Sequence, residues 1–228
     1  MDSETGVIRK KWNGRIKVAL VYPSTYHIGM SNLGFQAVYE LINTFENVVC
    51  ERSFLPENGG SDAADRITTI ESGSPISSFD LIAFSVSYEN DYPNLLTILE
   101  KAKLPLGFKD RGIPHPLVIA GGVAFFLNPE PLASFIDCFL IGEAEAILPR
   151  FFDAVSHDLL SRDRISCLKT LAREVPGVYV PSLYRTGYNS DGTLNAFEPI
   201  ADVPHKIERQ YVKDLSFTPT CSSIITPN

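Results

Sequence analysis

Residues 15–22 read RIKVALVY, a nearly continuous apolar run, and residues 23–34 that follow read PSTYHIGMSNLG. An apolar run without polar alternation predicts a strand that is buried on both faces, as in parallel sheets. A helix is expected next over Ser31–Asn43, where apolar side chains recur at helical spacing. This strand, loop and helix form the unit from which we predict the fold.

The same pattern recurs up to about residue 160. Further strands are predicted at Val48–Leu55, Asp80–Tyr88, Pro116–Ala120 and Asp137–Ile141, and further helices at Pro93–Lys103 and after Gly142. Strands that alternate with helices predict a parallel sheet covered on both faces. We therefore expect a doubly wound, five-stranded α/β domain of the flavodoxin-like or Rossmann-like class over residues 1–160, with strand order 2-1-3-4-5. An extra short helix is expected near Asp62–Ile67, and Pro149 should kink the last helix or mark its start.

Beyond residue 160 the pattern changes. Asp163–Arg173 is predicted to be a helix, and Gly177–Tyr184 and Thr193–Pro199 are predicted to be two strands joined by a turn at Asn189–Gly192. Residues 161–200 should thus form a small appendage of one helix and one hairpin. Residues 201–228 lack a periodic apolar pattern, and we interpret them as a linker toward a further domain.

Composition excludes several classes of protein. The 20 Lys and Arg against 27 Asp and Glu give a net charge of −7, which disfavours binding to nucleic acid by charge alone. The longest apolar stretch, Leu117–Leu127, is well short of the about 20 residues of a membrane-spanning helix. The four cysteines have neither metal-site nor disulfide spacing, so we expect free thiols in a reducing cytoplasm and no metal site; they are Cys50, Cys138, Cys167 and Cys221.

Ligands of an open parallel sheet bind at the carboxyl ends of its strands. Small or hydroxyl-bearing residues follow four of the predicted strands, which leaves room for a flat ligand. The alternative is that the glycines only allow tight turns and close helix packing. The candidate cofactor-binding residues are Ser24, Thr25, His27, Gly29, Ser31, Gly34, Ser85, Ser87, Gly121, Gly122, Gly142 and Glu143. Glu143 and Glu145 also stand where a helix begins, so the helix dipole alone is a second explanation for them.

Familiar nucleotide motifs do not fit the first loop. Gly29 and Gly34 have the spacing of the outer P-loop glycines, but Phe35 and Gln36 stand where Lys and Ser or Thr are needed. No GxGxxG follows the first strand, which disfavours a nicotinamide dinucleotide. The hydroxyl-rich loop leaves a flavin phosphate open.

At these residues the sequence resembles the N-terminal, cobalamin-binding-like domain of a subgroup of radical-SAM proteins. The matching stretches are 26–34 (YHIGMSNLG), 51–54 (ERSF), 79–89 (FDLIAFSVSYE), 118–122, 128–131 (NPEP), 141–145 and 177–181 (GVYVP). The resemblance implies that the chain continues into a radical-SAM barrel, its partner within the same polypeptide. A CxxxCxxC motif there would hold a four-iron–four-sulfur cluster that acts on S-adenosylmethionine. Residues 1–228 contain no such motif, so this part alone is not expected to be catalytic.

The resemblance also implies roles for single residues. Ser85, Ser87, Gly121 and Gly122 match the cobalamin-binding pattern in place and chemistry. In the histidine-ligating type of this domain, the first loop reads DxHxxG; aligned on His27, the Asp and Gly positions hold Thr25 and Met30. Thr25 is a poor second-shell acceptor for a ligating imidazole, so His27 as a cobalt ligand and as an ordinary loop histidine both stay open. Three functions remain: a cobalamin-binding module, a scaffold domain that binds no ligand, and a flavin-type oxidoreductase.

Overall fold

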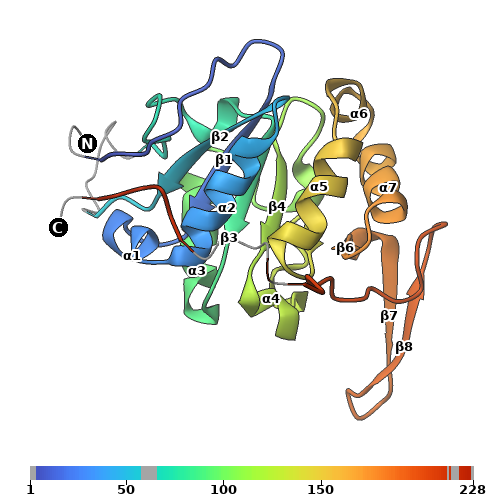
Figure 1. Ribbon diagram of the computed structural model, residues 1–228. Helices are drawn as coiled ribbons and strands as arrows, with labels where there is room; N and C mark the ends of the chain where they lie inside the picture. Colours follow the sequence, from blue (N-terminus) through green and yellow to red (C-terminus); the bar gives the residue numbers. More distant parts are fainter. Residues whose placement is uncertain (1–3, 58–65, 215, 217–220, 227–228) are drawn as a thin grey trace.

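A six-stranded sheet forms the centre of the molecule (Figure 1). The computed structural model describes residues 4–57, 66–214, 216 and 221–226. The strand order is β2-β1-β3-β4-β5-β6, and β1 to β5 run parallel. The strands are β1 Ile16–Tyr22, β2 Val48–Phe54, β3 Leu81–Ser85, β4 Leu117–Gly121, β5 Cys138–Leu140 and β6 Val178–Tyr179. The predicted doubly wound parallel sheet and its strand order are confirmed.

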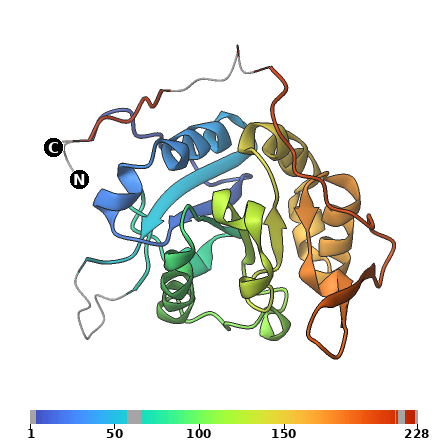
Figure 2. The same ribbon diagram turned by 90° about the horizontal axis from the view of Figure 1, so that it is seen from below.

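Helices cover both faces of the sheet. Helices α2 and α5 lie over one face and α3 over the other, while α6 and α7 flank the β6 edge (Figures 1 and 2). The helices are α1 Tyr26–Met30, α2 Leu33–Thr44, α3 Tyr92–Lys101, α4 Val123–Leu127, α5 Ala144–Ala154, α6 His157–Ser161 and α7 Arg164–Glu174. None of the helices in the described part of the chain combines the length and the apolar character needed to cross a membrane.

The structure corrects several predicted boundaries. The helix expected from Ser31 begins at Leu33, because Asn32 accepts a hydrogen bond from the backbone N–H of Phe35 and caps it. Pro149 lies inside α5, so the helix does not start there. The short helix expected near Asp62–Ile67 falls mostly outside the described residues, and the described residues 66 and 67 are not helical.

The appendage differs most from its prediction. The predicted strand Gly177–Tyr184 divides, because Val178–Tyr179 pairs antiparallel with β5 as a sixth strand of the main sheet. The hairpin consists instead of β7 Tyr184–Tyr188 and β8 Leu194–Pro199, which project from the body in Figure 1. The turn at Asn189–Gly192 is confirmed, with a hydrogen bond from the Asn189 N–H to Thr193 O of 2.8 Å.

The segment interpreted as a linker makes specific contacts where it is described. Gln210 pairs with Gly142 at the end of β5, and Ile225 pairs with Thr5 near the N-terminus. Figure 2 shows the described part of this segment beside α5 and its end, near residue 225, close to the N-terminus. The boundaries at residues 160 and 200 stay predictions.

Buried charges on β2 tie the N-terminal segment to the sheet. The Arg52 side chain is fully buried and pairs with Glu4 at 2.8 Å and with Glu71 at 2.7 Å. Its guanidinium also lies 4.8 Å from the centre of the Tyr39 ring. Burial raises the pKa of Glu71 above its ordinary value even though Arg52 opposes the shift. The arginine therefore keeps two buried carboxylates compensated.

Replacing Arg52 should destabilise the protein strongly. Arg52→Leu leaves two buried carboxylates without their partner, so urea unfolding should show a loss of about 3–5 kcal/mol at pH 7. Without Arg52 the folded-state pKa values of Glu4 and Glu71 rise above their unfolded values, so the loss should shrink as pH falls and the carboxylates protonate. Arg173→Leu is the control, because the exposed Arg173 lies 3.7 Å from Asp202 and should cost at most about 1 kcal/mol. If Arg52→Leu lost as little unfolding free energy as Arg173→Leu, or lost the same amount at every pH, Arg52 would not be compensating the two buried carboxylates.

Candidate functional site

A cavity of about 320 Å³ lies between the sheet and the two helices α2 and α5. Apolar side chains from β1, β3, β4 and β5 form its floor, and Ala37, Val38, Ile147 and Leu148 are among the helix residues that wall it. Residues at the carboxyl ends of β3, β4 and β5 form its rim. A cavity with these walls suits an apolar, flat group whose polar atoms remain at the rim.

The cavity brings together seven of the twelve predicted site residues. They come from four separate parts of the sequence and are Gly34, Ser85, Ser87, Gly121, Gly122, Gly142 and Glu143. Phe126 also lines the cavity, at its rim, but does not fill it. Phe125, its neighbour in helix α4, points into the core and packs against Tyr92 and Phe139.

Five of the twelve predicted residues do not line the cavity, because most of the first loop faces away from it. The reason is α1, which turns the loop toward β2: Gly29 packs so tightly against Phe54 and Tyr22 that a Cβ would overlap the Phe54 ring. The His27 side chain is 78% exposed, and its Nε2 lies 3.6 Å from a Glu57 carboxylate oxygen. The other three lie away from the cavity as well and are Ser24, Thr25 and Ser31. A cofactor role for these five residues stays a prediction that this geometry does not support.

Asn32 is a site residue that the sequence analysis missed. Its Oδ1 caps α2, and its Nδ2 donates to the Ser87 hydroxyl oxygen at 3.0 Å. Since the Ser87 oxygen accepts this bond, the hydroxyl proton of Ser87 remains free to be donated. The Ser85 hydroxyl has no hydrogen-bond partner within the described residues. The sequence did contain a signal for this residue, because an Asn directly before an apolar helix is typical of an N-cap.

The three glycines at the rim of the cavity have two different roles: some allow close backbone packing, and one leaves room for a ligand. Gly122 has a φ of +119°, and a Cβ there would overlap the carbonyl oxygen of Val86. Gly142 has a φ of +144°, and a Cβ there would overlap the carbonyl oxygen of Gln210. Gly121 has neither constraint, because its nearest neighbour would be Leu140 O at 3.6 Å. Gly122 and Gly142 thus permit close backbone approach, whereas Gly121 keeps space open in the cavity.

Cys50 lies apart from the other buried cysteines, whereas Cys138 and Cys167 are close enough to interact electrostatically. Cys50 is on β2 and Cys138 on β5, with three strands between them, and Cys167 is on α7. Burial raises the pKa of the Cys50 and Cys138 thiols well above the ordinary value. Within the described ranges, no three His, Cys, Asp or Glu side chains come together in a way that could hold a metal ion.

Residues 34–181, which include all but a few of the cavity residues, match the protein family described as the N-terminal region of radical SAM proteins. The chain belongs to this family. The finer resemblance to a cobalamin-binding-like subgroup stays a prediction.

Two individual proteins are also similar to the chain. An uncharacterized protein of Methanocaldococcus jannaschii is 25% identical over 187 residues, which are 78% of this chain and 37% of that protein. The solved structure of TsrM, a radical S-adenosylmethionine methyltransferase from Kitasatospora setae with tryptophan substrate and a SAM analogue bound, shares 19% identity. Its TM-score is 0.42, over 78% of this chain and 29% of TsrM. The chain therefore spans about a third of the length of these two proteins.

A pair of adjacent glycine variants separates the two roles of the rim. Gly122→Ala should lose about 1–3 kcal/mol of unfolding free energy, because the new Cβ meets both a positive φ and the Val86 carbonyl. Gly121→Ala should change stability by less than about 1 kcal/mol, since its Cβ makes only ordinary contacts. Urea unfolding of both variants measures the difference. Equal losses of unfolding free energy would show that the fold also requires a glycine at position 121.

Proposed function

We propose that the chain is the cobalamin-binding module at the N-terminal end of a radical-SAM protein. The observation that carries the proposal is the apolar cavity between the sheet and helices α2 and α5. Its rim is built from small and hydroxyl residues at the carboxyl ends of three strands, where open parallel sheets bind ligands.

The cavity fits one part of cobalamin. A volume of about 320 Å³ is at the lower end for small-molecule pockets, enough for a flat nucleotide base but not for a corrin ring. We propose that the base enters between α2 and α5, where Ser85 and Ser87 meet its polar atoms, and that the corrin lies outside on the carboxyl edge. Cobalamin, when bound, supplies cobalt-centred radical or group-transfer chemistry. The proposal uses no histidine ligand, because His27 lies outside the cavity.

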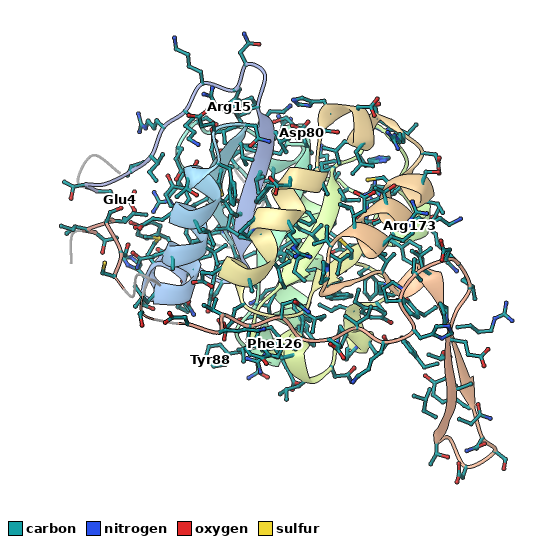
Figure 3. The ribbon with its side chains drawn as sticks, turned by 45° about the vertical axis from the view of Figure 1, so that its right-hand side comes forward. Glu4, Arg15, Asp80, Tyr88, Phe126 and Arg173 are labelled. Carbon is teal, nitrogen blue, oxygen red and sulfur yellow. The ribbon has the colours of Figure 1, made fainter. Side chains whose placement is uncertain are left out.

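The partner in this proposal is a radical-SAM barrel in the same polypeptide, with its iron–sulfur cluster and S-adenosylmethionine. Exposed apolar side chains gather at the carboxyl end of the sheet, among them Leu33, Tyr88, Val123 and Leu127. Figure 3 shows Tyr88 and Phe126 near this edge and Arg15 and Asp80 at the opposite one. An exposed apolar surface of this kind favours contact with another domain that covers it.

A scaffold domain that binds no ligand is the second candidate. It is favoured by Glu143, a predicted ligand-binding residue whose carboxylate accepts a hydrogen bond from the protein's own Val212 N–H at 2.7 Å. A flavin is a weaker candidate, since Ser24, Thr25 and Ser31, the hydroxyls predicted for its phosphate, lie away from the cavity.

Titration with hydroxocobalamin, followed by its absorbance, tests the cobalamin proposal. The wild-type chain should bind it, and Gly121→Leu should weaken binding at least about tenfold, because the side chain enters the cavity. Gly112→Leu is the matched control: Gly112 lies in a loop outside the cavity, and a Cβ there meets only Pro114 at 3.7 Å. Circular dichroism checks that both variants fold. No binding by the wild-type chain favours the scaffold; equal binding by Gly121→Leu would place the ligand elsewhere.

The chain alone should form no catalytic cluster. An iron–sulfur cluster needs several converging thiolates, and Cys50, Cys138 and Cys167 are buried on separate elements. After anaerobic reconstitution of residues 1–228 with iron and sulfide, we expect no stoichiometric cluster and no cleavage of S-adenosylmethionine. A stoichiometric cluster with turnover would overturn this assignment of roles within the protein.

A further inference from the structure

Residues 207–212, here called the strap, cross the carboxyl end of β5. Gln210 donates its N–H to Ile141 O at 3.0 Å and accepts the N–H of Glu143 at 2.9 Å. The Glu143 carboxylate then accepts the N–H of Val212 at 2.7 Å. The strap is thus paired to the residues that follow β5 by three hydrogen bonds over three residues.

Several positions in the fold accommodate the strap. Gly142 has a φ of +144°, and only the lack of a Cβ lets the Gln210 backbone approach it. The Arg209 guanidinium lies 4.3 Å from the centre of the Phe126 ring. Gly142, Glu143 and Phe126 all line the cavity, so the strap is fastened to its rim.

Hydrogen bonds hold most of the strap, and Ile207 at its start packs partly buried against the core. Arg209 is exposed and Tyr211 is 62% exposed, so the middle of the strap buries little apolar surface. Segments held mainly by exposed hydrogen bonds open at a small fraction of the global unfolding free energy. We therefore expect the middle of the strap to open at a lower free energy than the sheet.

The same chain segment is fastened to both helices that wall the cavity. Glu143 is the N-cap residue of α5. Further along, the carboxylate of Glu40 on α2 accepts hydrogen bonds from the Ser223 N–H at 2.5 Å and the Ser223 hydroxyl at 2.8 Å. Val212 of the strap and Ser223 further along thus each contact one of the helices that wall the cavity.

We propose that the strap is a detachable rim of the cavity and that Glu143 is its latch. Release widens access to the cavity and frees the Glu143 carboxylate and N–H toward a ligand. Because coupling between two equilibria is reciprocal, whatever moves the strap changes ligand affinity, and a ligand changes the strap. The regulatory role rests on the proposed function, whereas the latch and the rim can be tested without any ligand.

Hydrogen exchange in the ligand-free protein tests the latch. Glu143→Ala should accelerate amide exchange at Gln210 and Val212 about tenfold, because one bond of the strap is lost. Glu143→Gln should restore slow exchange, since its carboxamide oxygen can still accept the Val212 N–H. Glu145→Ala is the matched control: Glu145 lines the cavity but makes no contact with the strap among the described residues. Unchanged exchange in Glu143→Ala would overturn the latch.

Thiol labelling tests the rim. In a Cys221→Ser background, which removes the one exposed cysteine among the described residues, Leu148→Cys introduces a thiol on the cavity wall. N-ethylmaleimide should react with it severalfold faster when Glu143→Ala is added. An unchanged rate, despite faster strap exchange, would show that the strap does not close the cavity. If hydroxocobalamin fails to bind while both results hold, the cobalamin proposal fails, and the latch and the detachable rim stand without it.

Discussion

Strand β1 has a parallel partner on each side, β2 and β3, and the site depends on this arrangement. The chain leaves β1 toward one edge of the sheet to form β2 and leaves β3 toward the other edge to form β4 and β5. Loops at such a switch point diverge and leave a gap. Helices α2 and α5 lie over the same face on either side of this gap, and the cavity is the space that they leave. Small residues, above all Gly121, keep that space open.

Much of the sheet could be predicted because each strand carries its own local signal. RIKVALVY and DLIAF are apolar without alternation, and the intervening helices have clear periodicity, so strand order followed from connection rules. Val178 and Tyr179 were predicted to be extended but were assigned to the hairpin, because they form only two pairs with the main sheet, with residues of β5 that are distant in sequence. The buried charges of β2 were not predicted either, since Arg52 is compensated by Glu4 and Glu71, which no spacing rule connects to it.

The site was predicted in outline but not in its chemistry. Residues that directly follow β3 and β4 were placed correctly, because a strand end fixes their position. The first loop was misplaced, because the single turn of α1 moves His27 away from the cavity. The hydrogen bond of Glu143 could not be predicted either. Its partner, Val212, lies in a segment without a periodic apolar pattern, so the sequence did not indicate where this segment packs. Long-range pairing of polar backbone groups leaves no trace in local sequence.

We propose above all that this fold holds a cobalamin for a radical-SAM protein. The most direct measurement is the absorbance spectrum and cofactor content of the full-length protein, isolated anaerobically from cells supplied with cobalamin. We expect a cobalamin spectrum at close to one equivalent per chain, and its loss in Gly121→Leu while the iron–sulfur absorbance remains. A protein that carries its cluster but no cobalamin, or a flavin in its place, would contradict the cobalamin proposal.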